Sequence, residues 1–419
     1  MKIKTVDLPL DKALLITPPP QKKVVKPSRL FSTLIRIISA PDLIATKFTF
    51  KKERMDLAGK GPYLVLMNHS AFIDLKIAFK LLYPKRFYIV MTTDGMVGKK
   101  WLMEQIGCIP TKKFVPDMSL VASLNDALNN QKISVLMFPE AGYSFDGTAT
   151  ALPKKFGTII KKLGVPVVTI ITDGAYLRQP LYNNLLTRKV KTSAKMKCLL
   201  TKDEIALLSS KEIDDLIEKE FTFDNFKAQY DNKIKITENT RAEGLNRILY
   251  KCPNCKKEGL MQTKNDTITC NGCGKTYHLT EYGNITTSNN DAEFNFVSDW
   301  YKWEREEVKK ELLSNDYKLD VDVDIGILND YKALYMVGSG RLTHDKNGFN
   351  LFDKDGNLLY SQTPTFTYSL NADFYWYEIG DVISIGDNNR LYYLFPKQKD
   401  VVAKTRLATE ELYKIIKKQ

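Results

Sequence analysis

The sequence predicts an α/β protein whose sheet is mostly parallel or mixed, with covering helices, followed by a small cysteine-containing module and a C-terminal all-β module. Three observations predict this order. Short apolar runs alternate with amphipathic stretches between residues 62 and 172. Two close cysteine pairs lie within 251–283, and strand-like segments separated by turn residues follow from residue 317. Alternation is typical of βαβ units, whereas consecutive strands are typical of a barrel or sandwich.

Four apolar runs in the first part are rich in β-branched and aromatic residues and are too short for buried helices. These predicted strands are 63–67, 87–91, 133–138 and 166–171, and the predicted helices are 74–83, 99–107 and 118–130. In such sheets the loops that leave the carboxyl ends of the strands build the functional site. Two of these loops, 68–74 and 139–147, are rich in polar residues.

The first 60 residues are expected to form a basic linker and an amphipathic helix, since they hold 13 Lys and Arg against 5 Asp and Glu. Residues 17–27 contain three successive prolines and are expected to be extended. A helix is expected between Ser28 and Pro41. Its apolar face would comprise Leu30, Phe31, Leu34, Ile35, Ile37 and Ile38. Two placements of that face remain open, on the domain core or on a lipid surface, and the nearby lysines favour lipid.

The remaining chain is expected to be helical over 202–250 and 298–313, and then to form strands. The predicted strands lie within 317–328, 333–344, 349–360, 365–370, 375–379, 381–386 and 390–395, and a helix is expected over 401–418. A run of strands closed by one helix suggests a pleckstrin-homology-like barrel, a suggestion from fold analogy alone. The predicted domains are therefore 1–60, an α/β domain at 61–245, a ribbon module at 246–290 and a β module at 295–419.

Composition indicates a globular protein, with 43% hydrophobic and 26% charged residues. Uninterrupted apolar stretches are shorter than the ~18–20 residues that cross a bilayer, and the first residues lack the apolar core of a signal peptide. We therefore expect a cytoplasmic protein without a transmembrane segment. Its net charge of +13 favours polyanionic partners, namely nucleic acid, anionic lipid headgroups or phosphorylated substrates.

His69 follows the first predicted strand, and Asp74 lies about one helical turn further on. A histidine can accept a proton from an attacking hydroxyl, provided that a carboxylate fixes its other ring nitrogen. This pair would suit transfer of an activated acyl group to an alcohol. On spacing alone, a histidine that caps the helix is the more common explanation. Ser144 is a weaker nucleophile candidate, because its surroundings lack the second glycine of a nucleophile elbow.

Four ordered segments resemble the lysophospholipid and glycerol-phosphate acyltransferase family. NHSAFID at 68–74 is similar to its N-H-x-x-x-x-D signature, and FPEAGYS at 138–144 to its F-P-E-G-T-R-S block. GCIPTKKF at 107–114 and VPVVTI at 165–170 resemble its two other blocks. The resemblance covers roughly residues 60–180. It implies that His69 is the general base, that Asp74 orients it, and that Glu140 and Gly142 lie at the acceptor site.

One departure concerns the acceptor. Tyr143 stands where the family usually has an arginine that binds phosphate. The positive charge that the arginine would supply would then come from lysines, which bind phosphate without the paired hydrogen bonds of arginine. The candidates are Lys112 and Lys113, with Lys154 and Lys155 as a second pair. A lysophosphatidate acceptor remains the favoured expectation, with another headgroup or a simple alcohol as alternatives.

The cysteine pairs predict a structural metal. Cys252, Cys255, Cys270 and Cys273 follow a C-x2-C, x14, C-x2-C pattern, in which two knuckles supply four thiolates to one Zn²⁺. An iron–sulfur or redox role is the lesser interpretation. Zinc ribbons also occur in nucleic-acid-binding proteins, so that function is the alternative, although the ribbon's place between two domains makes nucleic acid an unlikely partner.

Together these features predict a peripheral membrane O-acyltransferase of phospholipid synthesis. Acyl-CoA or acyl-carrier protein would supply the acyl thioester, a lysophospholipid would be the acceptor, and the basic N-terminal region would bind the inner face of an anionic membrane. The segments 243–255 and 406–418 also resemble longer bacterial acyltransferase-like proteins with a ribbon and a C-terminal β module. A lipid-binding scaffold without catalytic activity is a further alternative.

Overall fold

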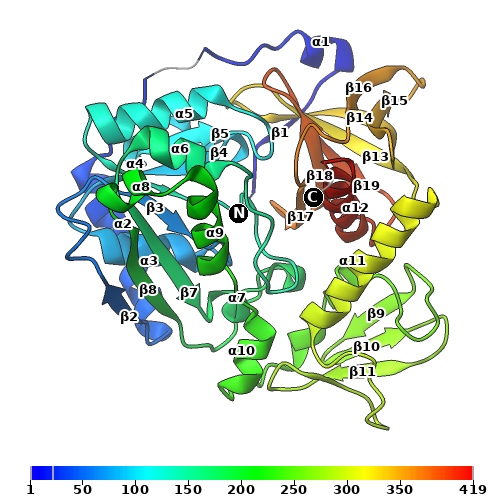
Figure 1. Ribbon diagram of the computed structural model, residues 1–419. Coiled ribbons are helices and arrows are strands. Elements are labelled where there is room, and N and C mark those ends of the chain that lie inside the picture. Colours follow the sequence, from blue (N-terminus) through cyan, green and yellow to red (C-terminus); the bar gives the residue numbers. More distant parts are fainter. Residues whose placement is uncertain (1, 21–22, 418–419) are drawn as a thin grey trace.

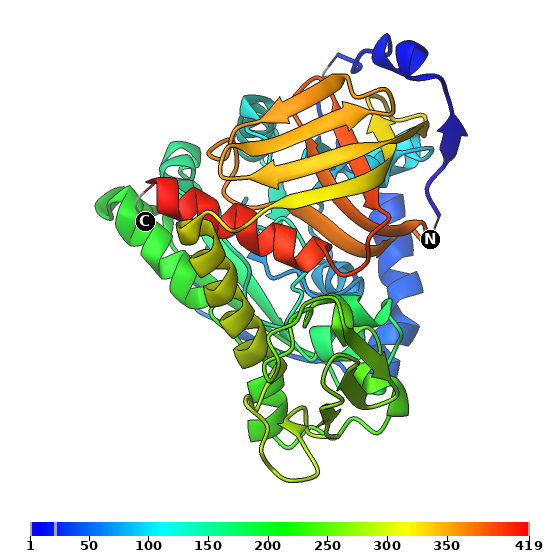
Figure 2. The ribbon, with the colours of Figure 1, turned by 90° about the vertical axis from the view of Figure 1, so that its right-hand side faces the viewer.

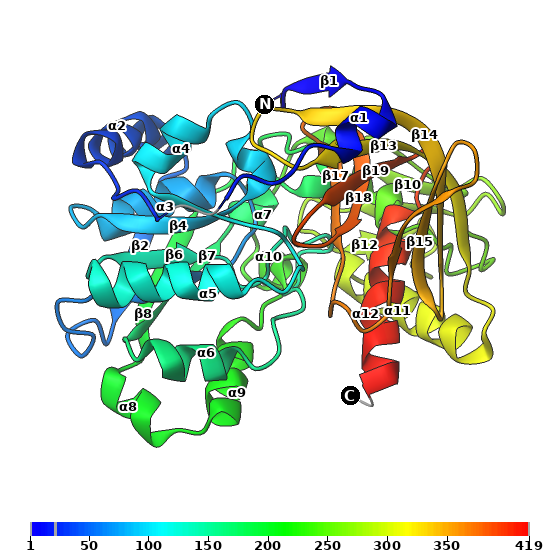
Figure 3. The same ribbon diagram turned by 90° about the horizontal axis from the view of Figure 1, so that it is seen from above.

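The computed structural model describes residues 2–20 and 23–417 (Figure 1). Residues 21–22 of the predicted linker and residue 418 of the predicted last helix lie outside this range. The α/β domain and the β module lie side by side, and the ribbon module lies beside both (Figures 1 and 3). The predicted fold class is confirmed, because a mixed α/β sheet with covering helices is followed by a small cysteine-containing sheet and a curved antiparallel sheet that ends in a helix.

The α/β domain is built on a seven-stranded sheet in the order β2-β8-β7-β3-β6-β4-β5. Its strands are β2 (Thr49–Glu53), β3 (Leu64–Met67), β4 (Phe87–Thr92), β5 (Cys108–Thr111), β6 (Ser134–Met137), β7 (Val167–Asp173) and β8 (Ser193–Leu200). The central pairings of β3 with β6 and β7 are parallel, whereas β8 runs antiparallel to β7. The four predicted strands are β3, β4, β6 and β7, and prediction missed β2, β5 and β8. β2 is exposed at the edge of the sheet, and β8 beside it alternates between buried apolar and partly exposed polar residues over Ser193–Cys198.

Helices cover both faces of this sheet. On one face lie α2 (Arg29–Ala45), α3 (Ile73–Leu82) and α4 (Lys100–Ile106), which contribute to one hydrophobic core. The core on the other face contains α5 (Met118–Asn125), η2 (Asp126–Asn130), α6 (Phe156–Leu163), α8 (Lys202–Leu207) and α9 (Ser210–Glu220). The connecting turns include η1 (Thr93–Met96), α7 (Ala175–Arg178) and η3 (Leu181–Asn183).

Helix α2 is longer than predicted, since it continues through Pro41 to Ala45. The proline leaves the carbonyl of Ile37 without its helical partner, on a side of the helix that water reaches, since Ile37 is exposed. Small polar residues face the domain, with Ser32 and Ser39 buried, whereas the predicted apolar face is turned largely to solvent.

Residues 202–250 are helical only in part. After α10 (Asn225–Asp231) the chain forms the short turns η4 (Asn239–Ala242) and η5 (Leu245–Arg247) rather than further α-helix. Gly244 departs from helical geometry with φ +87°, and a β-carbon there would lie 1.9 Å from the Tyr182 carbonyl oxygen. The ribbon module follows as a small antiparallel sheet of β9 (Met261–Lys264), β10 (Thr267–Cys270), β11 (Thr276–Leu279) and β12 (Ile285–Thr286).

The β module begins with α11 (Val297–Ser314) and ends with α12 (Val402–Lys417), which packs on α11 and under the curved sheet (Figure 2). The sheet order is β16-β15-β14-β13-β19-β18-β17. Its strands are β13 (Leu319–Leu328), β14 (Leu334–Asp345), β15 (Gly348–Asp353), β16 (Leu358–Gln362), β17 (Asn371–Trp376), β18 (Gly380–Gly386) and β19 (Leu391–Pro396). From the N-terminal region, β1 (Thr5–Asp7) pairs with β14, and α1 (Leu10–Leu14) follows it.

One predicted strand of the β module is wrong, and another is only partly right. Residues 365–370 form turns, because Pro364 has no amide hydrogen for a strand ladder and Phe366 N donates to the Thr363 carbonyl. Of the predicted strand 375–379, Tyr375 and Trp376 form the end of β17, whereas residues 377–379 form a tight turn with positive φ angles at Tyr377 and Glu378. Within the described residues, the helices are all too short or too polar to span a membrane.

Candidate functional site

His69 lies where β3 leaves the middle of the α/β sheet (Figure 1). The preceding residue, Asn68, joins this strand end to β7. Its Oδ1 accepts a hydrogen bond from Thr172 N at 2.8 Å, and its Nδ2 donates to the Thr172 carbonyl at 3.2 Å. Sequence reasoning did not identify Thr172, although the residue lies two positions after the fourth resemblance block. This two-way bond sets the direction in which the chain leaves the sheet.

Asp74 lies next to the His69 imidazole, as predicted. Its Oδ2 is 3.5 Å from His69 Nδ1, a long contact of the kind that unliganded sites often show. The same oxygen accepts hydrogen bonds from Ser70 N and Ala71 N at 2.7 and 2.9 Å, and Oδ1 accepts one from the Thr172 hydroxyl at 3.2 Å. Asp74 is fully buried. The backbone amides of Ser70 and Ala71, just before α3, therefore hold this carboxylate.

The imidazole is held in its neutral form. Burial lowers the pKa of His69 below its ordinary value, and Lys113 lowers it further, while Asp74 opposes the shift. Its side chain is 22% exposed, whereas Nδ1 is buried, so the accessible part of the ring faces away from Asp74. A neutral ring with one nitrogen beside a carboxylate and an accessible opposite edge has the arrangement that a general base requires.

Glu140 fixes the backbone on both sides of the site. Its Oε2 accepts a hydrogen bond from His69 N at 2.9 Å, and its Oε1 accepts one from Thr150 N at 2.9 Å. The residue is buried, and burial raises its pKa to about 7 against the effect of these two donors. These contacts give Glu140 a positioning role, and its role in acceptor binding stays a prediction.

We expect Glu140→Gln to lower the free energy of unfolding by about 1–3 kcal/mol, because the amide NH₂ group would face a buried backbone N–H. Urea unfolding measures this difference. Glu212→Gln is the matched control, since Glu212 also accepts a backbone hydrogen bond, from Ser209 N at 2.8 Å, but at an exposed helix start. Equal losses in both variants would contradict the importance of burial at Glu140.

Two aromatic rings enclose the imidazole. The centroid of Phe138 lies 4.1 Å from that of His69 with nearly parallel planes, and the centroid of Tyr143 lies 4.2 Å away at 32°. Two rings this close cannot share one face, so the imidazole is held between them. Tyr143 occupies the position of the arginine expected from the resemblance, and burial raises its phenol pKa. This contact was missed by sequence reasoning.

The predicted lysines are not equivalent. Lys113 is close enough to His69 to affect its pKa, whereas the Lys112 ammonium donates to the Asn388 carbonyl of the β module. Lys154 and Lys155 are exposed at the start of α6. A β-carbon added at Gly142 would meet no atom within 4 Å, so the space beside this residue is open. Of the predicted cations, Lys113 is thus the one that the fold brings to His69.

The β module also reaches this region. Asp373 of β17 has a pKa raised to about 6 by burial, and the charge of Lys113 opposes the rise. Burial raises the pKa of Tyr377, in the β module, and Asp94 of η1 raises it further through its charge and a hydrogen bond. Asp373 and Tyr377 lie far from the four blocks in sequence, and their pattern carries no signal that prediction could have used.

The four predicted cysteines come together in the ribbon module. Their sulfur atoms lie within 4.8 Å of one another, with Cys252–Cys273 at 3.8 Å and Cys255–Cys270 at 3.7 Å. A tetrahedral ion with metal–sulfur bonds of about 2.3 Å separates its sulfurs by about 3.8 Å, whereas a disulfide needs about 2.0 Å. The cluster therefore fits one bound metal ion.

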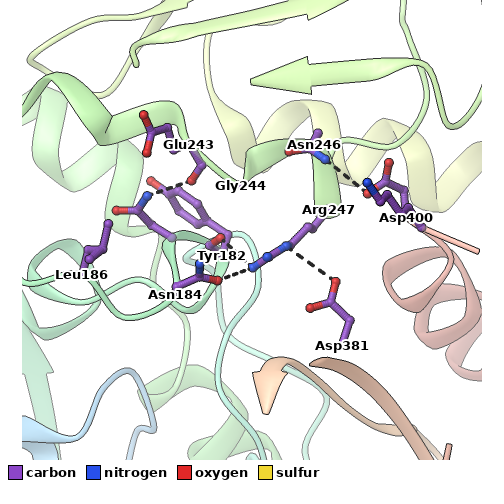
Figure 4. A pocket seen from close by; sticks show the side chains of 11 residues that line it. Tyr182, Asn184, Leu186, Glu243, Gly244, Asn246, Arg247, Asp381 and Asp400 are labelled. Carbon is purple, nitrogen blue, oxygen red and sulfur yellow. Dashed lines mark hydrogen bonds and ion pairs between the residues drawn. The ribbon is translucent and has the colours of Figure 1, made fainter. Parts of the chain in front are cut away.

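A separate cavity of about 350 Å³ lies where the three parts of the protein meet (Figure 4). Tyr182 comes from the α/β domain, Gly244 from the approach to the ribbon, and Asp400 from the β module. Arg247 extends across it, donating to Asn184 Oδ1, and its Nε lies 3.6 Å from Asp381 (Figure 4). Through Arg247, these contacts join the approach to the ribbon with Asn184 of the α/β domain and Asp381 of the β module.

Comparisons with known proteins find similarity to acyltransferases. The Acyltransferase family model matches residues 47–173. A chloroplastic 1-acyl-sn-glycerol-3-phosphate acyltransferase, BAT2 of Brassica napus, is 32% identical over 120 residues, which cover 27% of this chain and 33% of that protein. The solved structure of the 1-acyl-sn-glycerophosphate acyltransferase PlsC of Thermotoga maritima matches 45% of this chain and 76% of its own, at 17% identity and a TM-score of 0.37.

Residues 47–173 thus resemble the acyltransferase family in sequence. Their curated relative is a 1-acyl-sn-glycerol-3-phosphate acyltransferase, so the resemblance of the four sequence blocks is confirmed. The chain spans about a third of the length of that relative. The identity of the reaction partners is therefore a matter for proposal.

Proposed function

We propose that the protein is an O-acyltransferase that moves a fatty acyl group from a thioester to the hydroxyl of a lysophospholipid. The observation that carries this proposal is the contact between His69 and Asp74 at the end of β3, within the segment that resembles the acyltransferase family. Acyl-CoA or acyl-carrier protein would be the donor. Lysophosphatidate is the favoured acceptor, in keeping with the activity named for the curated relative.

In the proposed reaction, the acceptor hydroxyl attacks the thioester carbonyl as its proton passes to the imidazole nitrogen that faces away from Asp74. The carbon–oxygen bond of the ester forms, the carbon–sulfur bond breaks, and the proton leaves with the thiolate. Asp74 stabilises the imidazolium that forms during the transfer. Lys113 would attract an anionic acceptor, and the open space beside Gly142 would receive it.

The experiment that tests this function supplies the purified full chain with mixed acyl thioesters and a panel of lyso-acceptors, including lysophosphatidate and uncharged monoacylglycerol. Mass spectrometry identifies the ester product, and thiol release measures turnover. Formation of phosphatidate with an equal amount of thiol supports the proposal. Absence of both products with every acceptor overturns the enzymatic function, and vesicle binding without turnover would favour the lipid-binding scaffold.

We further propose that α2 attaches the protein to an anionic membrane at the inner face of the cell envelope. Ile37, Ile38 and Ile44 are 59%, 73% and 75% exposed. Trp101 of α4 is 66% exposed and lies 5.9 Å, ring to ring, from Phe31. Basic residues such as Arg29 accompany this apolar surface. Exposed isoleucines with a tryptophan and basic neighbours are typical of helices that lie in a membrane interface.

For this surface, we expect the double variant Ile37→Glu, Ile38→Glu to bind vesicles of phosphatidylglycerol and phosphatidylcholine at least about tenfold more weakly, because each isoleucine loses about 1.5–3 kcal/mol of burial. Vesicle sedimentation measures the binding. Leu207→Glu is the control, since Leu207 is 86% exposed on α8, which covers the opposite face of the sheet (Figure 3). Equal weakening in both variants would contradict a role for α2.

The bound metal is proposed to be Zn²⁺, held by the four thiolates of the ribbon module. Four cysteine ligands fill a tetrahedral site and leave no position for a substrate. Zinc here would stabilise the fold of the ribbon module, and the acyl-transfer chemistry would come from the α/β domain.

A further inference from the structure

Phe145, two positions after Tyr143, attaches the loop that carries Glu140 and Tyr143 to the β module. Phe145 is buried, and its ring centroid lies 4.5 Å from that of Phe374 on β17. The guanidinium carbon of Arg406, in α12, lies 4.4 Å from the ring centroid of Phe145. Arg406 Nη1 also donates to the Tyr143 carbonyl oxygen at 3.4 Å. The β module therefore contacts both the backbone of Tyr143 and the side chain of Phe145.

Arg406 is itself held rigidly. Its Nε donates to Glu410 at 3.2 Å, and Glu410 also accepts a hydrogen bond from the Ser369 hydroxyl at 2.6 Å and pairs with Arg305 of α11 at 2.7 Å. Arg406 and Glu410 are both buried. A buried guanidinium is tolerated only when its charge is paired, and its planar fork then has one allowed orientation. Its contact with the loop is consequently fixed in direction.

The other end of this loop reaches the imidazole. Tyr143 packs on one face of His69, opposite Phe138, and limits the exposure of that ring. Glu140 anchors the start of the loop of residues 141–145 to His69 N. At its other end, Arg406 holds the Tyr143 carbonyl and the Phe145 ring, and the Tyr176 hydroxyl of the α/β domain donates to the Phe145 carbonyl at 2.8 Å. Displacement of Arg406 would let the Tyr143 ring move away from the imidazole.

We propose that Arg406 is a positioning residue for the acyl-transfer site: it holds the Tyr143 carbonyl and the Phe145 ring so that the Tyr143 side chain stays against His69. The β module is then a working part of the site, although it lies outside the segment that resembles the acyltransferase family. The part of this inference that concerns turnover rests on the proposed function, whereas the part that concerns the imidazole does not.

The test uses the full chain labelled with ¹³C at histidine Cε1. It has three histidines, His69, His278 and His344, so three signals are expected and His69→Gln assigns one of them. His344 is buried with a pKa of about 3, which keeps its signal constant above pH 5. We compare Arg406→Gln and Arg406→Lys with Arg305→Lys. Arg305 is the matched control, because it pairs with the same Glu410 but the contacts to Tyr143 and Phe145 come from Arg406.

We expect both Arg406 variants to move the His69 signal and to raise its apparent pKa towards 6.5, because burial of the ring decreases. Arg406→Lys should show the smaller change, since it keeps a cation beside Glu410. Arg305→Lys should leave the His69 signal and titration unchanged, whatever its effect on the melting temperature. If Arg406→Gln does not fold, Phe145→Leu takes its place and should move the His69 signal in the same direction. Identical His69 titrations in the Arg406 variants, Phe145→Leu and the wild type would overturn the proposal.

Kinetics provide the second measurement. Displacement of a group that borders the base should lower kcat about tenfold with little change in KM for the donor. Unchanged kcat in a variant whose His69 signal has moved would reject the catalytic part of the inference. If the wild-type chain transfers no acyl group to any acceptor, the proposed function fails, and the histidine spectra still decide whether Arg406 positions Tyr143.

Discussion

Replacement of His69 by glutamine is expected to lower kcat for acyl transfer by about 10²–10⁴-fold, the range that a general base contributes. Glutamine has a similar size but cannot accept the hydroxyl proton. The wild-type imidazole has a lowered pKa, so it remains unprotonated at neutral pH. We therefore also expect kcat/KM to decrease only as the pH falls below 6.5. Stopped assays of thiol release over a pH series measure both effects.

The matched control is His278→Gln. Its side chain is 39% exposed on the ribbon module, where Nδ1 lies 3.7 Å from Asp266. The variant removes a histidine that lies beside a carboxylate outside the α/β domain, so we expect its kcat to equal that of the wild type. Asp74→Asn should also lose most activity, because the amide can no longer stabilise an imidazolium. A His69→Gln variant with at least half of the wild-type turnover would refute the assignment of the base.

Removal of the ribbon metal is the second change for which we expect a large effect. Cys252 and Cys270 are buried in the same hydrophobic core as Trp300 and Tyr277, so their thiolates need the ion in order to remain there. Structural zinc contributes about 10–16 kcal/mol of apparent binding free energy in small zinc domains. We expect Cys252→Ser, or treatment with a strong chelator, to unfold the ribbon module and to destabilise the packing of α11.

Zinc analysis should give one ion per wild-type chain and less than one in Cys252→Ser. Thermal unfolding, followed by tryptophan fluorescence, should show a lower transition temperature for the variant and for the chelated protein. Cys198→Ala is the control, since Cys198 is a buried free cysteine of β8 outside the cluster, and it should keep its zinc. A full zinc content in Cys252→Ser, or a chelated protein as stable as the untreated one, would reject the structural metal.

Much of the α/β domain could be predicted because its signals are local. The predicted apolar strands, such as β3 and β6, are buried on both faces of the sheet, so their hydrophobic runs are continuous. The loops that follow β3 and β6 carry the residues around His69. The missed strand β2 is exposed along its whole length at the edge of the sheet, and its neighbour β8 carries lysines at alternate positions, so neither has a continuous hydrophobic run. Local periodicity also described α2 as amphipathic, but it could not show which face of that helix contacts the protein.

The amino-acid sequence by itself determined which groups can meet within one turn or one knuckle. His69 with Asp74, and each Cys-x2-Cys pair, are joined by a few residues of backbone, so spacing indicates that they can meet. The choice of a general base over a helix cap at His69 came from the resemblance of the four sequence blocks. Only the tertiary structure decided that Tyr143 packs on the imidazole and that Arg406 holds its carbonyl from 263 residues away. Contacts of that kind depend on how two separately patterned sheets pack, and the free energy of that packing is distributed over many residues rather than encoded in a motif.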